Sequence, residues 1–244
     1  IIEFIYLIYI LAKIIKDLNM TNFIFPRLHK EGYRFLAIAI VITFVLLLIS
    51  NFLGLISLII TIWIYYFFRD PTRYSINDKN YLISPADGVI SQIVEINGPK
   101  ELGLENKKFT RISIFMNIFN CHVNRVPTSG KISKIFYKAG KFLNASLDKA
   151  SIDNERNYVR MIDENGNDLI LVQIAGLIAR RIVCEIKEDE KIEQGDKFGI
   201  IRFGSRVDLY FENYQLLVKL NQKTISGETI IATKKSNDWK QKRI

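Results

Sequence analysis

The amino-acid sequence predicts a mostly β protein: one sandwich- or barrel-like domain with an N-terminal hydrophobic helical membrane anchor. Two observations support this prediction. Residues 35–68 contain no charged side chain, and residues 69–244 contain short β-rich runs between turn signals. The second region shows no regular alternation of strands with helices, which argues against a parallel doubly wound sheet.

The composition of the chain excludes several classes of protein. The 244 residues are 49% hydrophobic and include 5 Pro and 13 Gly, so the chain is neither disordered nor collagen-like. Its mean hydropathy of +0.11 is high for a soluble domain. Two Cys exclude a disulfide scaffold, and two Cys with two His leave little for a structural zinc site. We therefore expect no bound metal.

The uncharged run is too long for one membrane span and slightly too short for two full ones. As a helix, residues 35–68 would measure about 51 Å, against about 30 Å for the hydrocarbon core of a bilayer. Ser50 and Asn51, with Gly54 just after them, interrupt the run and predict a hairpin of two short helices. A buried core helix is the alternative, but 34 uncharged residues are too many for one.

Basic residues flank the run on both sides. Arg27, Lys30 and Arg34 precede it, and Arg69 and Arg73 follow it. By the positive-inside rule, both ends of the hairpin lie in the cytoplasm. The expected location is the cell membrane, with the β domain on the cytoplasmic side, and one versus two membrane passes stays open.

The rest of the chain divides into an N-terminal part and the β domain. Residues 1–34 are interpreted as an extension and a basic juxtamembrane segment, and residues 1–19, before the first Met, are left out of the fold prediction. Residues 69–244 carry 29 Lys and Arg against 22 Asp and Glu, a balance that attracts anionic headgroups. Nucleic acid is the competing partner, and no zinc-finger, helix-turn-helix or RNA-binding signature supports it.

The strands of the β domain are predicted from apolar runs rich in β-branched and aromatic residues. Asn165 and Gly166 separate two of these runs, which is typical of a hairpin turn. Residues 138–156 have a polar composition and are expected to form a loop with a helical turn. The predicted strands are 81–83, 88–96, 111–118, 131–137, 158–162, 169–174, 181–186, 198–202, 207–211, 215–220 and 228–232.

The pair Gly204-Ser205, between two predicted strands, is the first candidate site. A Gly-Ser pair in this position is usually a plain turn. Gly204 has no Cβ, however, so its peptide reaches conformations closed to other residues. The Ser205 hydroxyl can then attack the preceding carbonyl, provided that a base takes its proton. The two residues alone leave both interpretations open.

Asp87 and His122 are candidates for the polar partners of such a serine. Asp87 lies in the string SPADG (84–88), which also suits a simple β-turn. His122 is the one His of the predicted β domain, and its ordinary pKa is close to neutral, so a general base is sought there first. A lone His is more often structural. Cys121 beside it is interpreted as a packed thiol rather than a nucleophile.

Arg180 and Arg181 are candidates for a phosphate contact, because a guanidinium group matches phosphate oxygens. A solvated charge pair at a strand edge explains them equally well.

Taken together, these segments resemble the phosphatidylserine decarboxylase proenzymes in their short bacterial and archaeal form. The resemblance runs from about residue 29 to residue 210, and the fixed order of its strings is far more specific than any single string. The strings are HKEG (29–32), FFRDPTR (67–73), SPADG (84–88), FMNIFNCHVNRVP (115–127), NERN (154–157), QIAGLIARRI (173–182) and GDKFGIIRFGSRVDLY (195–210).

The resemblance implies an enzyme that processes itself. The family cuts its own chain at a Gly-Ser bond, here Gly204-Ser205, after the Ser205 Oγ attacks the Gly204 carbonyl and the amide becomes an ester. Elimination then leaves a pyruvoyl group in place of Ser205, and this group is the covalent cofactor. The large chain, up to residue 204, and the small chain, residues 205–244, stay associated. The implied reaction converts phosphatidylserine in the membrane to phosphatidylethanolamine.

The family's Asp, His and Ser map onto Asp87, His122 and Ser205. Asp87 would orient His122, and His122 would take the proton of Ser205. Some members have a second His three residues after the first, where this chain has Arg125. Two rival functions stay open: a non-catalytic membrane-anchored β module, and a pyruvoyl decarboxylase for another amine substrate. The oligomeric state, including a homo-oligomer, also stays open.

Overall fold

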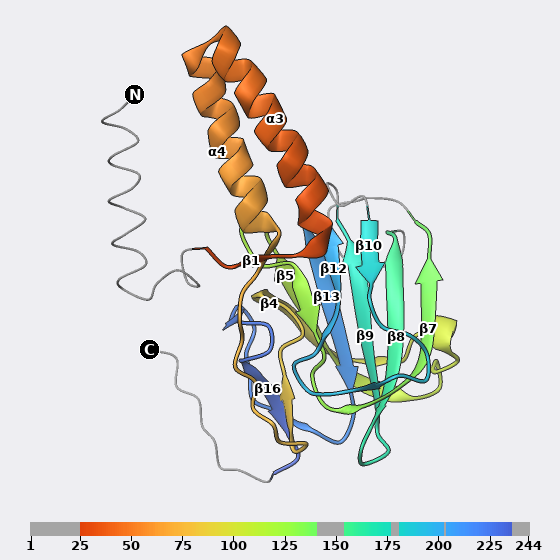
Figure 1. Cartoon of the computed structure of the whole chain (residues 1–244). Helices are drawn as coiled ribbons and strands as arrows, with labels where there is room; N and C mark the ends of the chain where they lie inside the picture. The colour runs from red at the N-terminus through yellow and green to blue at the C-terminus, as the bar shows by residue number, and fades with distance from the viewer. Residues whose placement is uncertain (1–24, 141–153, 177–180, 203, 236–244) are drawn as a thin grey trace. The chain divides into compact units, whose positions relative to one another are not determined.

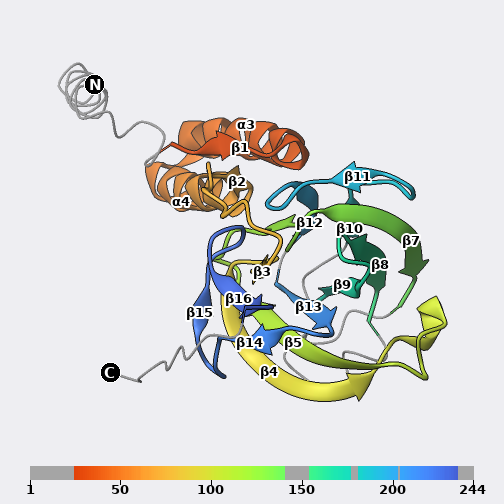
Figure 2. The same cartoon turned by 90° about the horizontal axis from the view of Figure 1, so that it is seen from below.

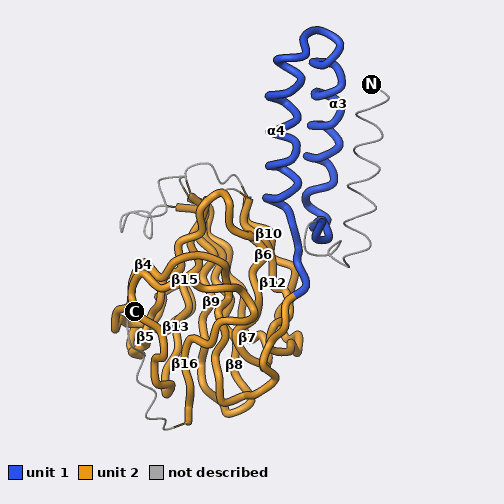
Figure 3. Tube along the Cα trace, turned by 90° about the vertical axis from the view of Figure 1, so that its left-hand side faces the viewer, with its two compact units in different colours: residues 1–72 blue, residues 73–244 orange. Residues whose placement is uncertain are grey.

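The computed structural model describes residues 25–140, 154–176, 181–202 and 204–235 (Figure 1). The chain forms two compact units, residues 1–72 and 73–244 (Figure 3). Most of the expected loop over 138–156 and Arg180 lie outside the described residues.

The first unit is built on two helices joined by a sharp break. Helix α3 (Tyr33–Ile49) and helix α4 (Asn51–Phe67) are separated by Ser50, whose extended backbone ends the first helix. Gly54 allows the helices to approach closely, because a Cβ at this position would lie 2.3 Å from Leu47 Cδ2. The short flanking elements are β1 (Arg27–Leu28), which pairs antiparallel with β2 (Arg69–Asp70), and the 3-10 turn η1 (Lys30–Gly32).

The two helices bury polar side chains against each other and present apolar ones outward. Thr43 Oγ1 hydrogen-bonds to Ser57 Oγ and to Thr61 Oγ1, at 2.8 Å each. Leu48, by contrast, is 74% exposed. Small and hydroxyl-bearing residues at the contact are typical of helices that pack in a bilayer. By length and composition, Lys30–Ile49 is the one helix among the described residues that could cross a membrane, whereas α4 is shorter.

The second unit is built on a curled antiparallel sheet, which confirms the mostly β prediction (Figure 2). Within the described residues, eight strands follow the order β11-β7-β8-β9-β13-β5-β4-β15, and β10-β12-β6 and β14-β16-β3 form two smaller sheets. The bounds are β3 Tyr81–Ile83, β4 Gly88–Asn97, η2 Lys100–Leu102, β5 Lys108–Met116, β6 Val123–Arg125, β7 Gly130–Lys138, β8 Arg156–Asp163, β9 Asp168–Ala175, β10 Arg181–Cys184, β11 Lys191–Ile192, β12 Lys197–Arg202, β13 Ser205–Phe211, β14 Gln215–Leu216, β15 Lys223–Thr224 and β16 Ile230–Thr233.

The two faces of the large sheet carry separate hydrophobic clusters. Along β13, Val207 and Leu209 are fully buried in the main core, whereas Tyr210 joins a smaller cluster on the other face. Because side chains alternate along a strand, Ser205 lies on the same face as Val207. The predicted turn between β8 and β9 is also confirmed, with Gly166 at a φ of +82°.

Candidate active site

Gly204 and Ser205 lie where the chain passes from one sheet to another. Strand β12 belongs to a three-stranded sheet, and β13 is a central strand of the large one. Gly204 has a φ of +40°, in the left-handed region that residues with a Cβ rarely adopt. The atom nearest to a Cβ built on Gly204 is Ile118 Cγ2, at 4.0 Å. The backbone conformation, rather than crowding, therefore favours glycine here.

Ser205 is fully buried at the first position of β13. It stands opposite Met116 at the end of β5 and opposite Ala175 at the end of β9. Its hydroxyl donates to Met116 Sδ, with Oγ and Sδ 3.8 Å apart. Two neighbouring strands thus hold the candidate nucleophile away from water.

His122 is fully buried just before β6. Its Nδ1 lies 3.0 Å from the carbonyl oxygen of Asn120. A carbonyl oxygen only accepts, so the neutral ring carries its proton on Nδ1 and Nε2 is the basic nitrogen. The His122 carbonyl oxygen accepts from the backbone N of Ile201 at 3.4 Å, which ties this residue to the strand that leads into Gly204. Cys121 beside it is also buried.

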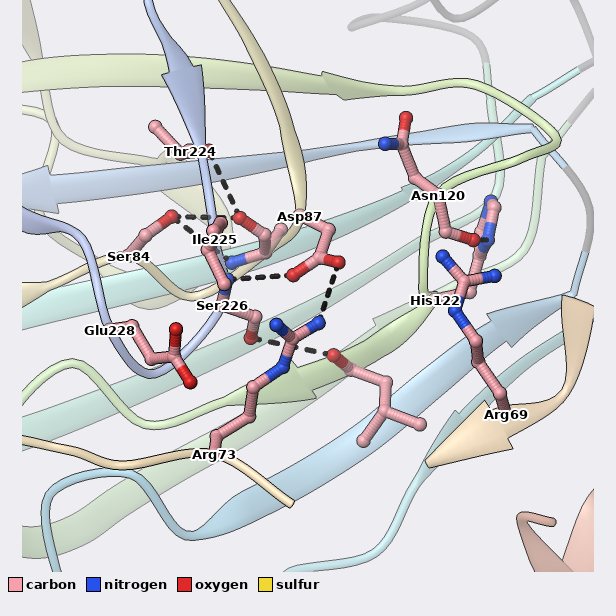
Figure 4. Close-up of polar contacts among 12 residues, drawn as sticks. Arg69, Arg73, Ser84, Asp87, Asn120, His122, Thr224, Ile225, Ser226 and Glu228 are labelled. Carbon is pink, nitrogen blue, oxygen red and sulfur yellow. Dashed lines mark hydrogen bonds and ion pairs between the residues drawn. The ribbon is translucent and has the colours of Figure 1, made fainter. Parts of the chain in front are cut away.

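Asp87 is bonded to partners that the resemblance does not suggest (Figure 4). One carboxylate oxygen accepts from Arg73 Nη2 at 2.8 Å, and the other accepts from the backbone N of Ser226 at 2.7 Å. Asp87 and His122 lie apart in this view, with no hydrogen bond drawn between them. The role of Asp87 in orienting His122 therefore stays a prediction.

Two arginines face each other close to Gly204. Arg181, the first residue of β10, stands directly opposite Arg202, the last residue of β12. Arg181 is exposed and Arg202 is half-buried. Like charges directly opposite each other destabilise a strand pair. The carboxylate of Glu155 lies nearby and accepts from the backbone N of Ile182 at 3.2 Å. Arg180 lies outside the described residues.

Sequence reasoning missed several residues that contact the candidate site. Arg73 belongs to the string FFRDPTR, but nothing in the string shows that its guanidinium binds Asp87. The amides of Asn124 and Gln173 are fully buried, and the Asn124 amide contacts the sulfur of Met116. Periodicity places such residues on a strand but does not identify which partner lies across from them.

Two other features do not form part of this site. A cavity of about 710 Å³ is lined by residues that include Ser129, Asp163 and Ile192. The first residue of β8 lies at the same level of the sheet as the start of β13, where Ser205 is. Asp163 is the last residue of β8, so the cavity lies at the other end of the sheet from Ser205. Burial raises the pKa of the Cys184 thiol, which makes it a poor nucleophile at neutral pH.

No cluster of three or more His, Cys, Asp or Glu that could hold a metal ion occurs in the part of the chain that the structure describes.

Comparison with known proteins identifies the family. The phosphatidylserine decarboxylase family model matches residues 60–232. The chain is 65% identical to the phosphatidylserine decarboxylase proenzyme of Pelagibacter ubique over 215 residues, which cover 88% of this chain and 100% of that protein. It is 50% identical to the proenzyme of Rickettsia typhi, over 91% of this chain and 98% of the relative. The proenzyme of Cereibacter sphaeroides is 48% identical over 87% and 92% of the two chains. The chain therefore belongs to the phosphatidylserine decarboxylase family of enzymes.

Proposed function

We propose that this chain is the precursor of a pyruvoyl-dependent phosphatidylserine decarboxylase that cuts itself between Gly204 and Ser205. The main support is the junction itself: a glycine at a φ of +40° precedes a fully buried serine at the start of a central strand. A break at this junction interrupts neither β12 nor β13. The name proenzyme, given to the relatives, agrees with a processing step.

The self-cleavage needs groups of this chain and one water molecule. Ser205 Oγ attacks the carbonyl carbon of Gly204 while His122 Nε2 takes the hydroxyl proton. His122 then gives this proton to the amide nitrogen of Ser205, so that the C–N bond breaks and an ester forms. Loss of the Cα proton of residue 205 then expels the Gly204 carboxylate and leaves dehydroalanine. Hydrolysis of the dehydroalanine by water then releases its nitrogen as ammonia and leaves a pyruvoyl group.

The surroundings of Ser205 fit such a group. A pyruvoyl group carries no charge and no more heavy atoms than the serine from which it forms, and the buried position opposite Met116 and Ala175 is apolar. When present, its ketone supplies the electron sink that decarboxylation of an amino acid requires. We assign to His122 the return of a proton to the carbon that loses carbon dioxide.

The proposed substrate is phosphatidylserine, and the product is phosphatidylethanolamine. We assign the substrate phosphate to Arg181 and Arg202, which are partners across β10 and β12, and, from the sequence alone, to Arg180, because a guanidinium group matches phosphate oxygens. Phe119, in the turn between Met116 and His122, is 69% exposed. An exposed aromatic ring favours the interfacial region of a bilayer, where the headgroups lie.

We assign membrane attachment to α3 and α4, with the β domain on the cytoplasmic side. The outward apolar side chains and buried hydroxyls of this hairpin support the attachment, and the basic residues at both of its ends support the orientation. Attachment keeps the enzyme in the same membrane as its lipid substrate.

The test is the intact mass of the purified chain in detergent. The wild-type chain is expected as two species, the smaller being residues 205–244, about 4.6 kDa as its share by length of 28.3 kDa. Its terminal ketone should react with phenylhydrazine. Vesicles of phosphatidylserine should yield phosphatidylethanolamine, and free serine assayed in parallel distinguishes a lipid substrate from a soluble amine.

Ser205→Ala is expected to remain a single 28.3 kDa species and to form no product, because no hydroxyl is left to attack. Ser113→Ala is the matched control, since Ser113 is equally buried on the neighbouring strand β5. It should be cut like the wild type. An uncut wild-type chain, or a cut Ser205→Ala chain, would contradict the proposal.

A further inference from the structure

Three buried amide side chains form a row that ends at the sulfur of Met116. Asn157 Nδ2 on β8 donates to Gln173 Oε1 on β9 at 3.0 Å, and Gln173 Nε2 donates to Asn124 Oδ1 on β6 at 2.9 Å. Asn124 Nδ2 then donates to Met116 Sδ at 3.7 Å. The same sulfur accepts the hydroxyl of Ser205, with 3.8 Å between Oγ and Sδ. Four strands thus contribute to one polar row that leads to the candidate nucleophile.

This row is cut off from solvent and has a fixed direction. Asn157 is 2% exposed, and Asn124 and Gln173 are fully buried. A buried amide is costly unless it is hydrogen-bonded, so each link removes part of that cost. An amide has distinct donor and acceptor ends, and the head-to-tail order therefore sets the orientation of every member. The row presents one oriented N–H group to Met116.

We propose that Met116 is a positioning residue for the Ser205 hydroxyl and that the amide row holds its sulfur in place. The inference rests on the proposed self-cleavage. A thioether sulfur is a weak acceptor, so it selects one orientation of the hydroxyl without holding it strongly. Ser205 donates to Met116 in the uncut chain, so the lone pairs of Oγ remain available to attack the Gly204 carbonyl. Because the sulfur accepts only weakly, the proton can leave this contact for His122 Nε2 when the attack occurs.

Packing alone does not account for this arrangement. Met161 is equally buried in the same core, and no hydrogen bond involves its sulfur among the described residues. Exchanges between Leu and Met are well tolerated in protein cores. A leucine at residue 116 would fill the core as well, but it would leave the Asn124 amide and the Ser205 hydroxyl without this shared acceptor.

The experiment follows scission of the full chain after pulse synthesis into phosphatidylserine-containing nanodiscs. Met116→Leu is expected to slow the appearance of both fragments three- to tenfold. Without the sulfur, the Ser205 hydroxyl can occupy any of three staggered rotamers, so the reactive one is populated less often. The loss of one hydrogen bond of ordinary net strength changes a rate by a factor in the same range. Met161→Leu is the matched control and should be cut at the wild-type rate. Hydroxylamine, which cleaves esters, should not restore the fragments of Met116→Leu, because the delay precedes ester formation.

Two isosteric replacements cover the case in which Met116→Leu does not fold. Norleucine in place of the three methionines exchanges sulfur for a methylene group and should slow scission, whereas selenomethionine keeps an acceptor and should not. Equal rates for Met116→Leu and Met161→Leu would overturn the positioning role, as would fragments restored by hydroxylamine. If Met116→Leu is misfolded, equal rates for the norleucine and selenomethionine chains would overturn it. An uncut wild-type chain would instead refute the proposed function.

Discussion

The carboxylate of Asp163 is expected to hold together the two pieces that the proposed cut would produce. It ends β8, and its side chain is 1% exposed. Its Oδ2 accepts from Lys234 Nζ at 2.7 Å and from the Tyr214 hydroxyl at 2.9 Å, and its Oδ1 accepts from the backbone N of Asn167 at 2.8 Å. Lys234 and Tyr214 follow the proposed cut, whereas Asp163 precedes it. Asp163→Asn removes the charge while nearly keeping the shape.

The magnitude follows from the pKa of Asp163. Burial alone raises this pKa, but the hydrogen bonds from Lys234, Asn167 and Tyr214 outweigh burial and lower the pKa from 3.8 to about 2. The difference corresponds to about 2 kcal/mol of folding free energy. Because the pKa is lower in the folded chain, this stabilisation is fully present above about pH 4 and is lost as the pH falls towards 2. For a domain of this size, 2 kcal/mol corresponds to a Tm lower by about 4–8 °C.

The assay is thermal unfolding of the purified protein in detergent, followed by circular dichroism at pH 7 and at pH 2. Asp163→Asn should lower the Tm by about 4–8 °C at pH 7, and the gap between variant and wild type should shrink at pH 2. Asp189→Asn is the control, because the Asp189 side chain is 82% exposed in its ion pair with Lys131. Equal Tm losses in the two variants at pH 7, or a gap independent of pH, would refute the reasoning.

Three further predictions concern the proposed site. His122→Ala should slow both self-cleavage and turnover, because the proposed base is gone; wild-type rates for both would exclude His122. Asp87→Asn should slow self-cleavage, measured by gel electrophoresis of fragments over time, and unchanged kinetics with a lower Tm would leave Asp87 as a structural partner of Arg73. Gly204→Ala should slow scission about 5- to 30-fold, since holding alanine at a φ of +40° costs about 1–2 kcal/mol. A rate equal to the wild type would show that the left-handed backbone is not needed.

The longer strands could be predicted from the sequence because each has a clear apolar run. The prediction of 88–96 corresponds to β4 (Gly88–Asn97), and that of 131–137 corresponds to β7 (Gly130–Lys138). The two-residue strands β11 and β15 were missed. Such strands are too short to show periodicity, and the sheet position of their neighbours determines their pairing. Two residues with no proline and little apolar character give no local signal that predicts a strand.

The site could be predicted only as far as its residues lie in recognisable strings. Gly204, Ser205 and His122 belong to such strings, and the structure adds the left-handed φ of Gly204 and the burial of the other two. The partner of Asp87 could not be found in this way, because Ser226 comes from a distant segment that reaches it only through the fold. The amide row could not be predicted from the sequence for the same reason, since its members come from separate strands.

The position of the proposed cut explains how a broken chain can remain folded. Strand β13 (Ser205–Phe211) pairs with β5 along its whole length and with β9 from Ser205 to Tyr210. Beyond it, β15 pairs with β4, and β16 pairs with β3, so the small chain contacts the large one at several separate strands. Val207 and Leu209 are also fully buried in the main core, and such burial contributes about 1.5–3 kcal/mol per side chain. A break within β13 would end a strand that is paired on both sides. A break at Gly204 ends neither strand, so the two pieces would keep all of these pairings.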